Sequence, residues 1–447
     1  MYNFEIDYLK LVVLHVVLGA AVFFVLPLAK VYGFGMLLVG VWWVIRNQNK
    51  NEEVLLVAAY IVGSEVFLRM TEGNPNHEFS KYAVLGLMAL GMYLSGYNKN
   101  AVPYLIFILL LLPGVVVGML VLSSNANIRN AITFNISGEL CLAVAAMYCY
   151  FRPVTLVITK KILLALGLPI IACAIYITLF TPDLREVITN TNSNTITSGG
   201  FGPNQVATAL GLGMFIFAVR MLYDSPTKIL FGINLVLTLL LAYRGLLTFS
   251  RGGILTGLFM LLLIITVTYL KVNSKGRIKI LAIIAVFMMV FTGAWLYTSM
   301  NTGGMIDKRY QNKDAMGREK ESQLAGREDI SVMELQGFLE NPLLGMGVGR
   351  GTDLRQEQTG LIVASHNELT RLLGEHGFFG ILALLVLIFV PLIAYLGNKD
   401  NIYILPFLVF WLLTINHAAM RTAAPAFVYA LALLKVQFHE KTAVHRE

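Results

Sequence analysis

Fourteen apolar segments follow one another along the chain. A straight span needs roughly 20 apolar residues, and several segments are shorter, so we expect about 12–14 transmembrane helices. Backbone polar groups inside a bilayer must be satisfied within helices or a closed barrel, so the pattern predicts an all-α polytopic membrane protein. The segments are residues 10–28, 31–45, 54–70, 82–96, 102–122, 138–151, 162–180, 204–222, 228–247, 252–270, 279–297, 377–396, 402–416 and 423–435.

The composition of the chain supports the same class. Of the 447 residues, 57% are hydrophobic and 13% are charged, about half the charged share of a soluble domain. That share cannot cover a soluble surface, which excludes a cytosolic enzyme, a disordered chain and a secreted scaffold. The net charge of +8 fits basic loops on one side of a membrane. The sequence has no basic stripe with interleaved aromatic residues, the pattern that would indicate nucleic-acid binding.

The distribution of Lys and Arg predicts the orientation. One alternating set of short loops, with the C-terminal tail, holds 15 basic residues, and the other short loops hold 7. The richer set should be cytoplasmic, so both termini should lie inside. The segments expected outside are 71–81, 123–137, 181–203 and 298–376.

Residues 298–376 form a large outer loop that divides the chain into three parts. The loop carries 21 of the 60 charged residues and should fold into a small helical subdomain, with helices at 327–340 and 365–376. Residues 1–297 should supply transmembrane helices, and residues 377–447 the last helices and a cytoplasmic tail. The polar stretch 190–200, NTNSNTITSGG, is expected to be mobile.

A histidine stands where the second loop helix should begin. Ser365 and Glu368 have the spacing of a capping box, which would put His366 in the first helical turn. Histidine is the usual general base, and the positive end of a helix favours the neutral imidazole. The alternative is a solvated loop histidine. His376 is expected to help end this helix, and His417 is the other histidine of interest near an outer end.

Arginines gather at the same predicted face. Arg251 stands at the junction of two spans, and Arg244, seven residues earlier, would share its face if the helix continued. Arg327 opens the first loop helix. Guanidinium groups suit phosphate because they offer two parallel donors and keep their charge. The alternatives are snorkelling for Arg244 and a solvated charge at a helix start for Arg327.

Several features argue against a metal or nucleotide cofactor. The sequence has no Asp-x-Asp pair, no His/Cys cluster and no P-loop; Cys141, Cys149 and Cys173 lie in apolar segments without ligand spacing. The run GMGVGRG at 345–351 has no βαβ context, so it indicates a turn-rich link and not a dinucleotide site. Glu65 and Arg69, four apart in one span, should neutralise each other.

Four sequence elements follow in order on the predicted outer face. They are Gly202-Pro203-Asn204-Gln205, Ser250-Arg251-Gly252, the run from Gly326-Arg327 to Gly347, and His366-Asn367 with Gly377 and Gly380 at H-N-x9-G-x2-G spacing. Together they resemble the bacterial O-antigen ligase and polymerase superfamily over about residues 200–395. One departure is Val332-Met333, where many members carry an aromatic residue.

The resemblance implies a fold like that of C-type glycosyltransferases and an activity at the periplasmic face of the cell inner membrane. The implied donor is a glycan on undecaprenyl pyrophosphate, and the implied acceptor is a sugar hydroxyl of lipid A-core or of another glycan. The resemblance implies that His366 is the base and that Arg251 and Arg327 hold the pyrophosphate. It assigns Arg244, Asn367 and Arg371 to substrate binding, without a metal or cofactor.

Two other functions fit the sequence less well. A polymerase that joins lipid-linked repeat units shares all the motifs, and the long charged loop late in the chain favours the ligase. A transporter or flippase is the alternative of a different class. Transporters often show an internal repeat and broken helices at mid-membrane, whereas the informative polar residues here lie towards one face.

We predict that residues 298–376 face outward and that both termini face the cytoplasm, because of the basic-residue bias. In intact cells, Lys313→Cys should react with an impermeant thiol reagent. Lys441→Cys should react only after the membrane is opened. The reverse labelling pattern would contradict the topology and the site assignments that depend on it.

Overall fold

The computed structural model describes residues 2–122, 127–181, 183–320, 327–360 and 363–437. Every predicted apolar segment overlaps a helix, and the described residues are 77% helical. The all-α prediction is therefore confirmed. These helices are α1 (Tyr2–Phe24), α2 (Leu28–Asn47), α3 (Glu53–Met70), α4 (Phe79–Ser95), α5 (Val102–Val121), α6 (Ile128–Cys149), α7 (Leu156–Phe180), α9 (Pro203–Tyr223), α10 (Lys228–Leu247), α11 (Arg251–Lys271), α12 (Ser274–Asn301), α16 (Glu368–Gly397), α17 (Ile404–Ile415) and α18 (Ala423–Leu431).

The helices divide into lipid-facing and central ones. Ten helices of the described residues are long and apolar enough to cross a membrane, and α4 and α17 are shorter apolar helices. In the most apolar stretch of α12, only 6% of the residues are buried within the protein, whereas in that of α9 89% are buried. Large apolar side chains such as Leu14, Leu38 and Leu120 are exposed on the outer helices. Apolar side chains on the outside are what a bilayer requires.

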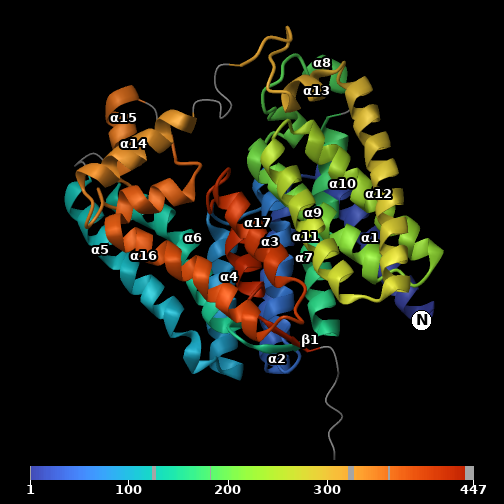
Figure 1. The fold of residues 1–447 in the computed structure, drawn as a ribbon, viewed down its shortest axis with the longest axis horizontal. Coiled ribbons are helices and arrows are strands. Elements are labelled where there is room, and N and C mark those ends of the chain that lie inside the picture. Colours follow the sequence, from blue (N-terminus) through green and yellow to red (C-terminus); the bar gives the residue numbers. More distant parts are fainter. Residues whose placement is uncertain (1, 123–126, 182, 321–326, 361–362, 438–447) are drawn as a thin grey trace, which may run out of the picture.

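The short loops separate into two ends, as the sequence predicts (Figure 1). At one end, which we call the tail end, strand β1 (Pro153–Thr155) pairs in parallel with β2 (Lys435–Gln437). The 3-10 helix η1 (Lys99–Ala101) directly precedes α5. Arg152 also pairs there with Glu52 at 2.6 Å. The opposite, loop end carries the short helices α8 (Leu184–Val187), η2 (Ile196–Ser198), α13 (Met305–Tyr310), α14 (Arg327–Glu340) and α15 (Arg350–Thr359).

The predicted helices of the large loop are present, with a change at the second. Helix α14 has the predicted bounds. The second helix begins at Glu368, later than expected, and leads into the α16 span across a kink at Gly377, where φ is 60° and ψ is −135°. The helix beginning at Glu368 therefore breaks next to His376, as predicted. The adjoining span continues to Gly397 at the tail end.

The glycine-rich run is a tight link between α5 and this kink. Met346 N–H donates to Gly374 O at 2.8 Å, and Val348 N–H donates to Gly114 O at 3.0 Å. Gly347 has φ of 94°. A Cβ on Gly347 would lie 2.6 Å from the backbone nitrogen of Gly118. Only glycine combines this conformation with so close an approach of two backbones.

We predict that Gly347→Ala lowers the free energy of unfolding by more than the about 1–3 kcal/mol of a strained backbone alone, because the methyl group also meets Gly118. Gly360→Ala is the matched control, since Gly360 has φ of 72° with nothing within 4 Å of its added Cβ. Thermal unfolding of the detergent-solubilised protein measures both. Equal losses would show that the contact with Gly118 contributes nothing.

Candidate functional site

His366 lies in the irregular segment just before α16. Asn367 is the N-cap, and its side chain accepts a hydrogen bond from Leu369 N–H at 2.9 Å. The predicted Ser365 cap is therefore wrong, because Asn367 satisfies the first helical amides instead. Ser365 Oγ accepts from Asn367 N–H at 3.2 Å and donates to Glu334 Oε2 at 3.2 Å. His366 is half-buried one residue outside the helix.

The loop between α17 and α18, residues 416–422, holds this segment from the other side. Ala419 N–H donates to the carbonyl oxygen of His366 at 3.1 Å. Arg421 Nη2 donates to the carbonyl oxygens of Ala364 at 2.9 Å and of Ser365 at 2.8 Å. This α17–α18 loop thus fixes the backbone on which His366 is carried.

Arg251 stands at the start of α11, after a sharp break in the chain. Helix α10 ends at Leu247, and Phe249 has φ of 56°. The two helices are therefore separate, as the two apolar segments indicate, and the continuous helix on which Arg244 and Arg251 would share a face is not present. Ser250 Oγ donates to Asn204 Oδ1 at 2.8 Å. This bond joins the Ser250-Arg251-Gly252 element to the Gly202-Pro203-Asn204-Gln205 element at the loop end.

Arg244 is buried within the bundle and is not directed to the outside by snorkelling. Its side chain is on α10, and Nη2 donates to the carbonyl oxygen of Ile177 in α7 at 2.7 Å. This contact supports a structural role at the outer end of α7.

The polar stretch 190–200 braces the break before α11 and is not the mobile loop that composition suggested. Thr197 Oγ1 donates to Leu247 O at 2.6 Å, and Asn194 N–H donates to Thr248 O at 3.1 Å. Thr197 and Ser198 are fully buried. Side chain–backbone bonds of Asn and Thr order the stretch.

His417 connects the two halves of the site. Its Nε2 lies 3.1 Å from Thr208 Oγ1, and its Nδ1 lies 2.8 Å from Leu413 O. A Cβ added to Gly252 would lie 2.6 Å from the His417 ring, so the ring packs directly beside the Ser250-Arg251-Gly252 element. The α17–α18 loop therefore contacts both the Arg251 element and the His366 segment.

The site also gathers the starts of four helices. Helices α9, α11, α16 and α18 all begin at the loop end. The helix dipole favours an anion at such ends, although amides at the starts of α16 and α18 already donate to Asn367 and Glu65. The loop end is consequently suited to a negatively charged group near Arg251.

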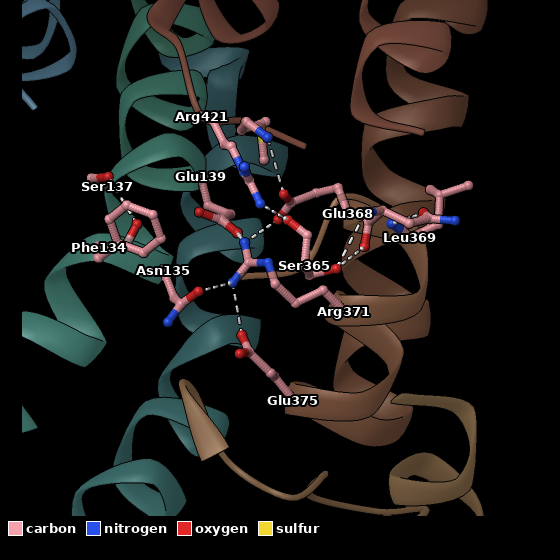
Figure 2. A network of polar contacts seen from close by, with 12 residues as sticks. Phe134, Asn135, Ser137, Glu139, Ser365, Glu368, Leu369, Arg371, Glu375 and Arg421 are labelled. Carbon is pink, nitrogen blue, oxygen red and sulfur yellow. Dashed lines mark hydrogen bonds and ion pairs between the residues drawn. The ribbon is translucent and has the colours of Figure 1, made fainter. Parts of the chain in front are cut away.

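Arg371 is the centre of a buried charge cluster (Figure 2). Its Nη2 donates to Glu139 and Glu368, and its Nη1 donates to Glu375 at 2.8 Å and to Asn135 at 3.4 Å. All five side chains of this Arg371 cluster are buried. Because Arg371 already faces three carboxylates, the geometry supports a positioning role and gives no free donor for a substrate anion.

A second set of ion pairs lies next to this cluster. Glu65 and Arg69 are buried and 2.8 Å apart, as the sequence predicted. Glu78 Oε2 accepts from Lys81 at 2.6 Å. Burial alone would raise the pKa of Glu78, but the hydrogen bond from His77 and the charges of Lys81 and Arg69 lower that pKa to about 2.

Helix α14 is fastened to the start of α16 through Glu334. Its Oε2 accepts from Thr370 Oγ1 at 2.6 Å, and its Oε1 lies 3.6 Å from Arg355 Nη1. Burial raises the pKa of Glu334 in spite of these partners. Arg327 begins α14, but its side chain lies outside the described part of the structure.

Sequence reasoning missed Arg421 and Glu139. Arg421 has no motif around it and is recognised only from its contacts with Ala364 and Ser365. Glu139 gave a signal, because a lone acid in an apolar span is costly and usually has a partner, but Arg371 is 232 positions away. Among the described residues, no group of three His, Cys, Asp or Glu side chains could hold a metal ion.

The fold and this end of the bundle define a multi-pass helical membrane protein with a polar site at one face. Residues 236–385 match the family model described as O-antigen ligase, which agrees with the resemblance found in the sequence. The matched region runs from α10 into α16 and includes Arg251, Arg327 and His366. A search of curated proteins finds no match.

We predict that Arg371→Met lowers the free energy of unfolding by about 3–5 kcal/mol, because it leaves three buried carboxylates without their cation. Arg371→Lys should lower the free energy of unfolding by less than Arg371→Met but should not match the wild type, since an ammonium cannot reproduce the guanidinium fork. Unfolding in denaturant, followed by tryptophan fluorescence, measures the loss.

The control for this prediction is Arg318→Met. Arg318 also pairs with an acid, Asp314 at 2.8 Å, but its side chain is 73% exposed. An exposed pair contributes little to stability. Equal losses for Arg318→Met and Arg371→Met would contradict the importance of the buried cluster.

Proposed function

We propose that the protein is an O-antigen ligase-type glycosyltransferase. It moves a glycan from undecaprenyl pyrophosphate to a sugar hydroxyl of lipid A-core at the periplasmic face of the inner membrane. One observation carries the proposal: the α17–α18 loop packs His417 on Gly252 and bonds Ala419 to His366. The two family-like elements are thereby linked through one loop at one end of the bundle.

In the proposed reaction, His366 accepts the proton of the acceptor hydroxyl. The acceptor oxygen attacks the anomeric carbon, and the bond from that carbon to the pyrophosphate oxygen breaks with inversion. Arg251 and Arg327 hold the leaving pyrophosphate and stabilise its developing charge. Pyrophosphate is a good leaving group, so the reaction needs neither a metal nor a general acid.

The surroundings of the three nearby histidines support His366 as the base. Both ring nitrogens of His417 lie at hydrogen-bond distance from Thr208 and Leu413. His376 is completely buried beside Gly114 of α5. His366 is half-buried, so a substrate can reach it, and its backbone is fixed by Ala419.

The other proposed site residues take supporting roles. Asn367 caps α16 next to the base and sets where the helix begins. Arg244 and Arg371 act from within the protein, because their donors already bind Ile177 and the carboxylate cluster.

A polymerase would use the same residues with a lipid-linked repeat unit as acceptor. The lipopolysaccharide pattern of a deletion strain separates the two activities. Loss of the ligase leaves lipid A-core without polymer while lipid-linked polymer accumulates. Loss of a polymerase leaves lipid A-core capped by a single repeat.

We predict that His366→Ala lowers the transfer rate by about 10²–10⁴-fold, the usual contribution of a general base, while donor affinity is unchanged. Arg251→Ala should weaken donor binding as well as turnover, and Arg251→Lys should restore only part of both. The assay is glycan transfer by purified protein in excess chelator, since no step is assigned to a metal.

His77→Ala is the matched control. His77 is another histidine at the loop end, its side chain is 64% exposed, and its contacts are with Glu78 and the ring of Phe134. Its loss should leave the rate near that of the wild type. Near-normal turnover of His366→Ala would show that the base is elsewhere, and activity that requires added Mg²⁺ would contradict the metal-free mechanism.

A further inference from the structure

A large cavity opens at the tail end of the bundle, at the opposite end from the proposed catalytic site. It lies between the start of α7, the ends of α9 and α11 and the segment that precedes α17. Its volume is about 580 Å³, within the range of roughly 300–1,000 Å³ for small-molecule sites. The lining residues include Leu156, Lys160, Tyr223, Lys271, Asp400 and Ile402.

Most of the cavity wall is apolar. Leu156, Ile402 and the ring of Tyr223 contribute to it. The hydroxyl of Tyr223 donates to Thr268 Oγ1 at 2.8 Å, and Thr268 Oγ1 donates to Ile264 O at 2.7 Å. Because these hydroxyls are engaged within the protein, the wall between them offers mainly hydrocarbon. Such a wall favours a ligand that carries a hydrocarbon chain.

The helix ends around the cavity carry apolar side chains on the outside. Val157 of α7 and Leu270 of α11, next in sequence to the lining residues Leu156 and Lys271, are both exposed. In a membrane protein, exposed apolar side chains of this kind contact the bilayer. The lipids of the bilayer therefore lie within reach of the cavity.

Lys160 shares its acid partner with a second cation. Lys160 Nζ lies 2.8 Å from Asp224 Oδ1, and Arg220 Nη1 lies 3.0 Å from Asp224 Oδ2. Arg220 is buried, whereas the side chain of Lys160 is 32% exposed. Asp224 thus keeps a buried cation when Lys160 turns towards a ligand.

Lys271 is held only by weak partners. Its Nζ lies 3.8 Å from Asp400 Oδ1, and the side chain of Asp400 is 87% exposed. Lys271 Nζ also donates to the carbonyl oxygen of Lys399. An ion pair so exposed contributes little, so an anion competes well with Asp400 for this lysine. The three cations, with Lys160 and Arg220 included, outnumber their two acid partners, which favours an anionic ligand.

We propose that this cavity binds an anionic phospholipid, with Lys160 and Lys271 holding the headgroup phosphate and an acyl chain lying along Leu156, Tyr223 and Ile402. Basic pockets between membrane helices on the cytoplasmic side bind anionic lipid headgroups. In the orientation predicted from the sequence, the lipid belongs to the cytoplasmic leaflet. It joins α7, α9 and α11 at the tail end and takes no part in the glycan transfer at the loop end.

The test measures binding of phosphatidylglycerol to the full-length protein in detergent by native mass spectrometry, with phosphatidylcholine for comparison. The wild type should bind phosphatidylglycerol more tightly. Lys160→Gln and Lys271→Gln should each weaken that binding by about fivefold, and the double variant by about tenfold or more, the effect of losing a basic residue near an anionic headgroup. Binding of phosphatidylcholine should not change.

Two further variants separate charge from shape. Leu156→Trp keeps both lysines but fills the apolar part of the cavity, so it should weaken binding of phosphatidylglycerol. Lys50→Gln is the matched control, because Lys50 is exposed at the tail end and does not line the cavity. It should bind phosphatidylglycerol as the wild type does. Inorganic phosphate, added as a competitor, should not displace the lipid because it cannot use the apolar wall.

The other outcomes would overturn the proposal. Equal binding of the two lipids by the wild type would show only general contact with the bilayer. Unchanged binding in the double lysine variant would place the headgroup elsewhere, and an equal loss in Lys50→Gln would show a diffuse surface charge. Displacement of the lipid by inorganic phosphate would assign the lysines to a free anion.

Discussion

The ion pairs of Arg371 with Glu139, Glu368 and Glu375 hold together the end of the bundle that carries the site. A charge in an apolar bundle is tolerated only where partners neutralise it. Here one guanidinium joins Glu139 of α6 to Glu368 and Glu375, which lie before the kink in α16. The cluster therefore fixes the start of α16 relative to the rest of the bundle, and the position of the proposed base depends on it.

Two irregular segments complete the site around this fixed helix start. The α17–α18 loop binds the backbone at 364–366 through Ala419 and Arg421. The glycine-rich run enters between α5 and the α16 kink, where backbone hydrogen bonds replace side-chain packing. Catalytic and binding residues of many enzymes lie on loops that a rigid scaffold holds in position, and the described contacts provide that support here.

Hydropathy predicted the helices well because each apolar segment must form a helix to satisfy its own backbone in lipid. The four family-like elements also indicated His366 and Arg251. A local rule failed where a tertiary partner decides the outcome: Ser365 donates to Glu334 of α14, and Asn367 caps the helix instead. The partners of Arg371 and the role of Arg421 could not be predicted, because no local pattern relates Glu139 to a residue 232 positions later.

Helix α18 is buried along its whole length although it is synthesised after every helix on which it packs. It lies against α6 and α3, and Ala423 N–H donates to Glu65 Oε2 at 2.7 Å. Strand β2, just beyond it, pairs with β1 from far earlier in the chain. Until α18 is inserted, the surfaces of α3 and α6 that it covers have no protein partner, and Glu65 lacks this backbone donor. Insertion of α18 covers these surfaces, so the order of membrane insertion and the order of packing are different.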